Sequence, residues 1–406
     1  MRLGYAYSRY PVLSQTFCDA EMLELERRSH EIVLGSLYPP KTDLRHPYLR
    51  CLRAPIQYAP SSRDLDHLMR KAQRRGRWPA KLVSEHEHKY GAEYKASLRA
   101  RNALFFVQLF ENARVPHFHV HFANRAAHTA LFVKEITGIP FSVTAHGQDF
   151  MSDLGSTELL REICAAAAFV AAETDYSRNL LARCCPESAS KIIRVYNGLD
   201  LSRFPEAKLT GRTGNPLRIL SVGRLVAFKG FEVLIDACAI LRERGVQLTC
   251  TIIGDGALRE GLLTKVSQLD LVAQFSFVGE ASQDDVLAAL EECDLFALAS
   301  TVDERGASDV FPTVIAEAMA CAKAVVSTTV AGIPELVAHG KTGLLVSPDD
   351  PRALAEAIAR ISSDPETLRA YGQAGRLRLE ENFTIEKTIE PLLAQFQRRV
   401  PASRAI

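Results

Sequence analysis

Residues 217–237 read LRILSVGRLVAFKGFEVLIDA, and this stretch decides the fold. An apolar run ends at Gly223, a short turn follows, and apolar residues then recur at helical spacing from Phe231. A strand, a turn and a helix in this order form the repeating unit of a parallel α/β sheet. Arg224 and Lys229 flank the turn, where two cations meet the free amides of a helix N-terminus. We expect a phosphate site here, the alternative being two solvated surface charges.

The same alternation of strand and helix runs outward through both halves of the chain. Residues 201–216, LSRFPEAKLTGRTGNP, interrupt it and read as a linker because they are polar and rich in Gly, Pro and Thr. Two doubly wound parallel α/β domains are therefore predicted, 1–200 and 217–383, with a helix in 384–406 packing back on the first domain. Ligands of such sheets bind at the carboxyl ends of the strands, so we expect a site in a central cleft.

Composition excludes several classes of protein. With 406 residues, 47% apolar and 24% charged, the chain is neither disordered nor fibrous. Its longest apolar run, Ile163–Ala172, is too short to cross a bilayer, and the N-terminus lacks the apolar region of a signal peptide. Nine cysteines without a CxxC pair read as buried hydrophobic residues. We therefore expect a cytoplasmic protein.

Charge is unevenly distributed along the chain. The net charge of +1 argues against a nucleic-acid partner, but residues 41–115 carry 16 Lys/Arg against 7 Asp/Glu. We expect a basic helical insertion at about 61–114, with five cations between Arg70 and Arg77 beside Leu68, Met69 and Trp78. Such a segment predicts peripheral contact with an anionic membrane, and a solvated helix face is the alternative.

A second motif spans residues 308–328, SDVFPTVIAEAMACAKAVVST. Pro312 suits the first turn of a helix, which leaves the amides of Thr313 and Val314 free to hold an anion. Asp309 precedes this helix and Glu317 lies more than a turn inside it, so both carboxylates are predicted to line one pocket and grasp different hydroxyls. The alternative is that Asp309 caps the helix while Glu317 faces solvent.

These motifs resemble a known family. GRLVAFKGFEVLIDA, IIGDG, FVGE, the Asp309–Glu317 segment and AGIPELVAHGKTGLLV follow the order and spacing of family 4 glycosyltransferases, retaining enzymes of the GT-B architecture. In the first half, RYPVLSQTF, HVHFAN, GIPFSVTAHGQDF and VYNGLDLSRF resemble the exopolysaccharide branch of that family, the colanic-acid and amylovoran type. The resemblance implies two Rossmann-like domains facing a cleft, with acceptor binding in the first and nucleotide-sugar binding in the second.

The resemblance also implies roles for individual residues. The residues that it places at the reaction are His146, Arg224, Lys229, Asp309 and Glu317, with the two cations neutralising the donor diphosphate and Glu317 gripping the ribose. Asp309 stands where the family usually has Glu, followed by Val310 where Gly is usual, which puts the identity of the donor sugar in question. The donor-binding set is Gly223, Arg224, Lys229, Gly254, Gly256, Val278, Asp309, Phe311, Pro312, Thr313, Val314 and Glu317.

Histidines are unusually dense in the first half. His146 ends a strand in TAHGQDF and resembles the family's histidine near the reacting sugar carbon. Alternation puts His117, His119 and His121 on one face of a strand, but no carboxylate or Cys pattern accompanies them, so we expect packing and no metal. The residues expected near the acceptor are Ser14, Gln15, Thr16, His121 and Asn124.

The resulting hypothesis is a retaining, metal-independent hexosyltransferase. It would move a hexose from a nucleoside-diphosphate sugar, UDP-sugar before GDP-mannose, to a glycan or lipid-linked acceptor in exopolysaccharide or cell-surface polysaccharide synthesis. No cofactor is expected. The expected location is the cytoplasm, on the inner face of the membrane. Two alternatives stay open, namely a sugar-nucleotide 2-epimerase-like enzyme and a non-catalytic protein that binds a sugar nucleotide or glycolipid.

Overall fold

The computed structural model describes residues 1–204 and 216–400 of the chain. The chain divides into two compact units. Unit 1 contains residues 1–43, 47–195 and 389–406, and unit 2 contains residues 44–46 and 196–388. Residues 201–204, predicted to begin a linker, lie in unit 2 with Phe204 buried, and residues 205–215 of that linker lie outside the described residues.

Unit 1 is built on a parallel sheet of seven strands within the described residues, in the order β3-β2-β1-β4-β5-β6-β7. The strands and longer helices have the following bounds: β1 Arg2–Arg9, α1 Thr16–Arg27, β2 Glu31–Tyr38, β3 Ile56–Tyr58, α2 Ser62–Arg74, α3 Ala80–Tyr90, α4 Ala96–Asn112, β4 Phe118–His121, α5 Arg125–Thr137, β5 Phe141–Ala145, α6 Thr157–Ala166, β6 Val170–Ala172, α7 Asp175–Cys184, β7 Ile192–Arg194 and α16 Glu390–Gln397.

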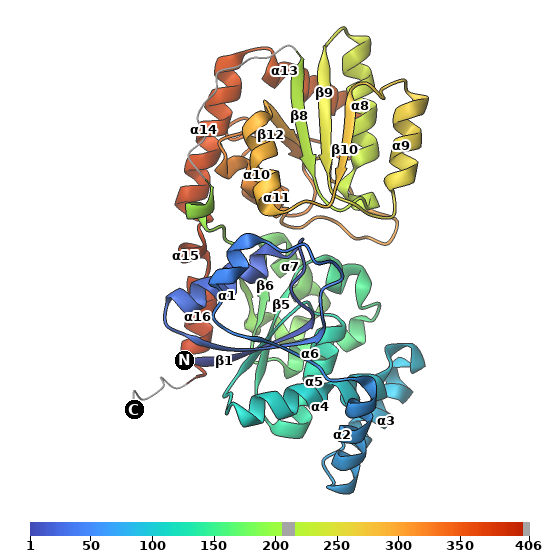
Figure 1. The fold of residues 1–406 in the computed structure, drawn as a ribbon, viewed down its shortest axis with the longest axis vertical. Helices are drawn as coiled ribbons and strands as arrows, with labels where there is room; N and C mark the ends of the chain where they lie inside the picture. The colour runs from blue at the N-terminus through green and yellow to red at the C-terminus, as the bar shows by residue number, and fades with distance from the viewer. Residues whose placement is uncertain (205–215, 401–406) are drawn as a thin grey trace. The chain divides into compact units, whose positions relative to one another are not determined.

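Helices cover both faces of this sheet (Figure 1). Because successive side chains of a strand point to opposite faces, Ala6 of β1 joins the core under α4 and α5, while Tyr5 and Tyr7 join the core under α1 and α16. The predicted basic insertion at 61–114 is too wide, since α4 packs Phe106 and Phe110 into the main core of the unit. The added segment is therefore confined to α2, α3 and their connections.

Unit 2 repeats the design with a six-stranded parallel sheet, counted over the described residues, in the order β10-β9-β8-β11-β12-β13. The bounds are β8 Leu217–Val222, α8 Phe231–Glu243, β9 Leu248–Ile253, α9 Arg259–Gln268, β10 Phe275–Gly279, α10 Gln283–Glu292, β11 Leu295–Ala297, α11 Thr313–Ala320, β12 Ala324–Thr328, α12 Ile333–Leu336, β13 Leu344–Val346, α13 Pro351–Ser362, α14 Pro365–Asn382 and α15 Ile385–Thr388.

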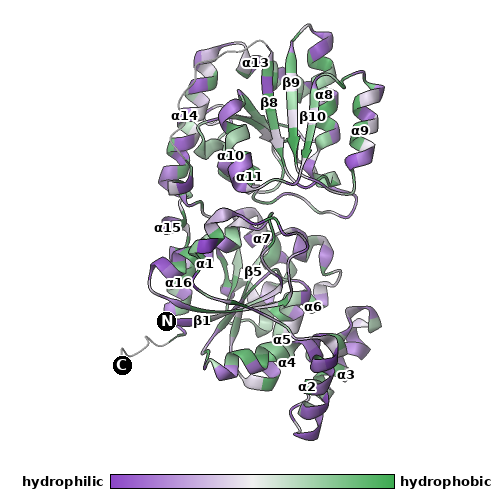
Figure 2. Cartoon of the chain, viewed as in Figure 1, coloured by the Kyte–Doolittle hydropathy of each residue, from purple (hydrophilic) through white to green (hydrophobic). Residues whose placement is uncertain are grey.

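Strand β8 shows how the sequence specifies this sheet. Leu217 and Ile219 face α8, α9 and α13, whereas Leu220 and Val222 face α10, α11 and α14. Figure 2 shows the apolar strands enclosed by helices that are polar on their outer sides. A sheet buried on both faces needs apolar residues at successive positions, which explains the continuous run LRILSV. In the described residues, no helix is long and apolar enough to span a membrane.

Candidate functional site

The predicted phosphate loop follows β8, at the point where the strand order of unit 2 reverses. β8 pairs with β9 on one side and with β11 on the other, so its carboxyl end adjoins the crevice in which α/β sheets bind ligands. A short 3₁₀ turn, Ala227–Lys229, leads into α8. The backbone N–H of Thr301 donates to the carbonyl of Phe228 at 2.9 Å, so the loop lies against the segment that follows β11.

Gly230 allows this close approach. It has φ of +67° and caps α8 without a side-chain hydrogen bond. A Cβ at this position would lie 1.7 Å from the carbonyl oxygen of Ala299. Only glycine fits both the left-handed backbone and the contact. The first turn of α8 thus keeps its free amides at the carboxyl edge of the sheet.

Lys229 and Asp309 form an ion pair at this edge. The Lys229 ammonium contacts Oδ2 of Asp309, and the two side chains are 11% and 13% exposed. The Ser300 hydroxyl lies 3.5 Å from the same carboxylate oxygen. Arg224 is exposed, with its guanidinium carbon 5.8 Å from the ring centroid of Phe228. Three residues predicted for the donor site therefore come from one edge of unit 2.

Glu317 lies in the second turn of α11 and is 6% exposed, so it does not face solvent as the alternative required. Burial raises the pKa of its carboxyl to about 7, although nearby Arg203 and a hydrogen bond with the Gln283 side chain act in the opposite direction. A buried carboxylate with so few charged partners is poised to accept hydrogen bonds from hydroxyl groups.

The other predicted residues of α11 divide into two kinds. Pro312 is the N-cap, and the helix begins at Thr313 without a side-chain cap, so the amides of its first turn have no capping side chain. Thr313 and Val314 are partly exposed there. Phe311, by contrast, is 4% exposed and packs beside the rings of Tyr196 and Phe383. The prediction that the Phe311 side chain contacts the donor is therefore wrong, because this side chain is part of the core.

A second loop, after β9, joins the phosphate loop. The backbone N–H of Leu225 donates to the carbonyl of Asp255 at 3.0 Å. A Cβ on Gly254 would lie 2.0 Å from the carbonyl oxygen of Gly223, and one on Gly256 would lie 2.5 Å from that of Leu225. These glycines allow two loops to touch. Val278, at the end of β10, is 54% exposed and offers an apolar surface beside them in the sheet.

Three residues near Glu317, namely Arg203, Gln283 and His46, were not predicted from the sequence to belong to the site. Gln283, at the start of α10, accepts from the Arg203 guanidinium at 3.3 Å. Its backbone N–H donates to Nδ1 of His46 at 3.1 Å, and His46 is buried. His46 belongs to unit 2 although it stands in the first half of the chain. Contacts over 80 and 237 residues leave no local pattern, so only the fold reveals them.

In unit 1, His146 directly follows β5, as predicted. Its backbone N–H donates to the Asp149 carboxylate, and its side chain is 5% exposed. Nδ1 lies 3.2 Å from Oε2 of Glu173, and Nε2 lies 2.9 Å from Nδ1 of His121. His121 is 1% exposed and also reaches Glu21. The ring of His121 is enclosed by protein groups, and its expected place near the acceptor stays a prediction.

His117 and His119 are also buried on the predicted strand face. Nε2 of His117 and Nδ1 of His119 lie 2.9 and 2.8 Å from the Ser142 hydroxyl. Glu21, His119 and His121 bring ligand-type atoms within 4.8 Å of one another, so a carboxylate does accompany this cluster. Every ring nitrogen of His119 and His121 already lies in a hydrogen bond, and we assign the cluster to a hydrogen-bonded network. Independence from metals stays a prediction.

The predicted acceptor residues lie at two helix starts of unit 1. Ser14 is exposed, and Gln15 and Thr16 begin α1 without a side-chain cap. Asn124 caps α5, its side-chain oxygen accepting from the Ala126 N–H at 3.2 Å. That hydrogen bond gives Asn124 a structural role. Ser14, Gln15 and Thr16 remain predictions for acceptor binding.

The basic segment is exposed only in part. Arg70, Lys71, Arg74 and Arg75 of α2 and its C-cap are exposed, and Figure 2 shows α2 as strongly polar. Arg77 instead pairs with Glu111 of α4. The apolar neighbours behave differently from the prediction, since Leu68 and Trp78 pack against the core of unit 1. Leu68 and Trp78 therefore make their apolar contacts within the protein.

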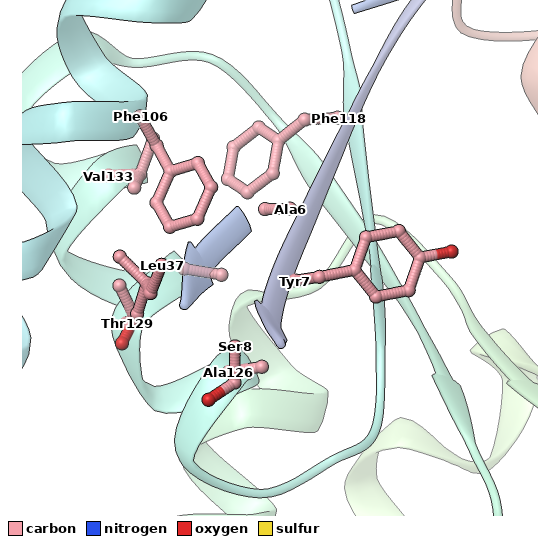
Figure 3. A pocket seen from close by; sticks show the side chains of 10 residues that line it. Ala6, Tyr7, Ser8, Leu37, Phe106, Phe118, Ala126, Thr129 and Val133 are labelled. Carbon is pink, nitrogen blue, oxygen red and sulfur yellow. The ribbon is translucent and has the colours of Figure 1, made fainter. Parts of the chain in front are cut away.

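Unit 1 also contains a small internal cavity, lined by residues of β1, β2, α4, β4 and α5 (Figure 3). Its volume of about 10 Å³ holds no more than one water molecule. Phe106, Phe118 and Val133 make its lining mostly apolar. The cavity is a packing defect of the core and is too small to hold a substrate.

Two family models match the chain in succession. Residues 22–203 match Glycosyltransferase Family 4, and residues 205–378 match Glycosyl transferases group 1. Together with two parallel-sheet Rossmann-like units, these matches place the chain among the glycosyltransferases of the GT-B type. The chain belongs to the family that its motifs resembled.

Individual relatives show which glycosyltransferases the chain is similar to. The chain is 35% identical over 208 residues to the amylovoran biosynthesis glycosyltransferase AmsK of Erwinia amylovora, covering 51% of this chain and 50% of AmsK. It is 36% identical over 200 residues to the putative colanic acid biosynthesis glycosyltransferase WcaL of Escherichia coli K12, covering 49% and 48%. The chain spans about half the length of these curated relatives.

The fold is shared with solved glycosyltransferases over nearly the whole chain. The crystal structure of Anabaena HepE in complex with UDP-glucose superposes with a TM-score of 0.76, covering 98% of this chain and 100% of HepE. The identity is 19%, so this likeness concerns the fold alone. It agrees with the prediction of two doubly wound Rossmann-like domains, which is confirmed.

Proposed function

We propose that this protein is a retaining hexosyltransferase that uses a nucleoside-diphosphate sugar and builds an exopolysaccharide or cell-surface polysaccharide. A UDP-sugar is the favoured donor, and GDP-mannose is the second candidate. The observation that carries the proposal is the ion pair of Lys229 and Asp309 beside the uncapped start of α8. It puts a cation for phosphate and a carboxylate for sugar hydroxyls side by side at the edge where α/β sheets bind ligands.

The donor diphosphate would bind against Arg224, Lys229 and the first amides of α8. The anomeric carbon loses its bond to the diphosphate oxygen and gains one to the acceptor oxygen. The acceptor proton leaves with the diphosphate, and the two cations offset the charge that develops on it. The side chains supply the charge that a divalent metal would otherwise supply, so we propose a metal-independent enzyme. Retention of configuration is the outcome that the family resemblance supports.

The nucleoside would lie across the loops after β9 and β10. Glu317 is placed to accept hydrogen bonds from the ribose hydroxyls, and its burial makes each such bond stronger than in water. The exposed face of Val278 would pack against the base. HepE, whose fold this chain shares, was solved in complex with UDP-glucose. This supports uracil as the first donor base to test.

The acceptor would be a glycan or a lipid-linked glycan bound by unit 1, where Ser14, Gln15 and Thr16 offer polar groups at the start of α1. AmsK and WcaL are named for the biosynthesis of amylovoran and colanic acid, which supports an exopolysaccharide substrate. The exposed cations at the end of α2, namely Arg70, Lys71, Arg74 and the C-cap residue Arg75, would hold the enzyme at the anionic inner face of a membrane, in the cytoplasm.

The test is donor turnover with and without acceptor. Purified protein is incubated with UDP-glucose or GDP-mannose, and release of nucleoside diphosphate is measured in the presence of lipid-linked oligosaccharide and in its absence. Acceptor-dependent release, unchanged by EDTA, is expected. Conversion of the donor into its C2 epimer without any acceptor would favour an epimerase-like enzyme, and tight binding without turnover would favour a non-catalytic protein.

A further inference from the structure

Four buried side chains form a continuous hydrogen-bonded chain at the carboxyl edge of the unit 1 sheet. The order is Glu21, His121, His146 and Glu173, and the joining distances are 3.2, 2.9 and 3.2 Å. His121 ends β4, His146 follows β5 and Glu173 follows β6, so three adjacent strands each supply one member. Glu21 comes from α1.

Hydrogen-bond chemistry fixes the direction of the contact between His146 and Glu173. An ionised carboxylate only accepts, so Nδ1 of His146 donates to Oε2 of Glu173 at 3.2 Å. A neutral imidazole carries one N–H, so Nε2 of His146 is left to accept, and Nδ1 of His121 lies 2.9 Å from it.

The surroundings keep the ring of His146 neutral. Burial, reinforced by His121, lowers the pKa of His146 to about 3. At the other end of the chain, burial opposes ionisation of Glu21, but the charge and hydrogen bond of His121 outweigh it and lower the Glu21 pKa to about 2. Glu21 is therefore an acceptor, and His146 donates from Nδ1 to Glu173.

Neighbouring rings hold the pair in place. The Tyr7 ring stacks on His121 with centroids 5.6 Å apart and an interplanar angle of 7°. Phe17 and Phe122 lie 4.5 and 4.8 Å from the His146 ring centroid. Asp149 accepts from the backbone N–H of His146, and burial raises the pKa of that carboxyl to about 6. The titratable groups that face the two rings are Tyr5, Tyr7, Cys18, Glu21, His119, Asp149 and Glu173.

We propose that His121 and Glu173 are positioning residues that lock the His146 imidazole in one neutral tautomer, protonated at Nδ1. Both nitrogens of His146 are then engaged by protein groups, and His146 serves the active site as a fixed, uncharged ring and not as a proton acceptor. This inference deepens the proposed function and rests on it for its kinetic consequence, whereas the tautomer is a property of unit 1 alone.

A matched control exists in the same unit. His86 and His128 form a second buried pair at 3.0 Å, and His86 reaches Glu162 at 2.7 Å. These residues join α3, α5 and α6, apart from the strand-end chain. His86→Gln therefore removes one buried ring from a second Glu–His–His arrangement without touching His146.

The experiment is nitrogen-detected NMR of the ring nitrogens in protein labelled at its eleven histidines, from pH 6 to pH 8. Assignment uses His121→Gln, His146→Gln and His86→Gln. For His146 in the wild-type protein we expect a protonated Nδ1 and a bare Nε2 throughout. A His146 ring that is protonated at Nε2, or that titrates in this range, overturns the proposal.

Kinetics then separate positioning from simple packing. In His121→Gln we expect mixed tautomers of His146, a kcat lowered about tenfold, a KM for the nucleotide sugar within about twofold of wild type, and a new inflection in the kcat–pH profile. His86→Gln should leave the His146 signals and the profile unchanged. If both variants alter kcat equally with an unchanged profile, the positioning role is wrong. The expected NMR pattern without any transfer by the wild-type protein would overturn the proposed function and leave the tautomer standing.

Discussion

The Lys229 ammonium is paired with the Asp309 carboxylate across 80 residues of sequence, and both side chains are nearly nine-tenths buried. One comes from the turn before α8 and the other from the segment before α11, so the pair ties together the two loops that flank the ends of β8 and β11. Asp309 is one methylene shorter than the glutamate that the family resemblance led us to expect at this position. In the proposed reaction, Asp309 orients Lys229 toward phosphate while remaining able to accept from a sugar hydroxyl.

Removing the ammonium should abolish most of the turnover. We expect Lys229→Ala to lower kcat by roughly 10²–10³, because the departing diphosphate loses a charge partner. Nucleoside diphosphate release from the preferred donor measures this. Lys265→Ala is the matched control, since Lys265 of α9 pairs with Asp236 of α8 at 2.8 Å in the same unit. Comparable rates for Lys229→Ala and Lys265→Ala would contradict the assignment.

Donor binding should depend on pH through Glu317. Burial raises the pKa of this carboxyl to about 7, so it is largely protonated at pH 6 and largely ionised at pH 8. Because the ionised form accepts from ribose hydroxyls, affinity for a nucleotide sugar should rise by roughly tenfold over this range. Isothermal titration calorimetry at both pH values measures it. Glu317→Gln should bind more weakly and without this slope, and an equal slope in that variant would assign the titration to another group.

Gly230 should be intolerant of any side chain. Gly230→Ala would bring a Cβ to 1.7 Å from a backbone carbonyl at a positive φ, and we expect a loss of roughly 2–4 kcal/mol in the free energy of unfolding. Gly261→Ala is the control, because Gly261 lies in α9 with open space around it, and it should gain about 0.5–1 kcal/mol. Urea denaturation compares the two. Equal stability of the two variants would show that the loop is not packed as described.

Acid should destabilise the fold through buried histidines. Burial lowers the pKa of His117, His128 and His146 to about 3 each. A depressed folded-state pKa means that the stability contributed by each neutral ring is present above pH 6.5 and is lost as pH falls toward 3. Asp149 and Glu317, whose pKa values are raised, act in the opposite direction. The free energy of unfolding from urea titrations at pH 7 and pH 4.5 should be smaller at pH 4.5.

A variant separates the histidine contribution from the rest of the acid titration. His128→Gln should reduce the difference between the two pH values, since one group that must charge on acid unfolding is absent. An unchanged or larger difference in this variant would attribute the acid sensitivity to other residues.

The exposed cations of α2 should mediate reversible membrane binding. The wild-type protein should sediment with anionic vesicles at low salt, more weakly at high salt, and not with neutral vesicles. Reversing Arg74 and Arg75 to Glu should weaken sedimentation, whereas reversing Arg352 and Arg360, exposed cations of α13, should leave it unchanged. If the wild-type protein ignores anionic vesicles at low salt, the membrane role is to be abandoned.

The strands were predictable because burial on both faces leaves a strong local pattern. LRILSV and EIVLGSLY are strands in the structure as the alternation predicted. β3, Ile56–Tyr58, was missed because it has only three residues, is an edge strand and is partly exposed, so it needs no apolar run. α4 was grouped with the basic insertion because its flanking charges hid an apolar face that packs into the core.

The site was predictable where it resembled family motifs and not where it depends on distant contacts. Lys229, Asp309 and Glu317 were identified from local motifs, but the ion pair between the first two was not. Glu21 reaches His121 over 100 residues, and nothing near either residue signals the contact. Tertiary hydrogen bonds of this kind have no periodicity, which is why the buried chain of Glu21, His121, His146 and Glu173 emerged only from the fold.

The most direct test of the account is the melting temperature of the protein with nucleotide sugars. A ligand present at a hundred times its dissociation constant stabilises the folded state by about 2.7 kcal/mol, a rise in melting temperature of roughly 5–11 °C for a domain of 150–250 residues. UDP-glucose or GDP-mannose should give such a rise in the wild-type protein and in Lys265→Ala, and a much smaller one in Lys229→Ala. No rise with either nucleotide sugar, or an equal rise in Lys229→Ala, would contradict the proposed donor site.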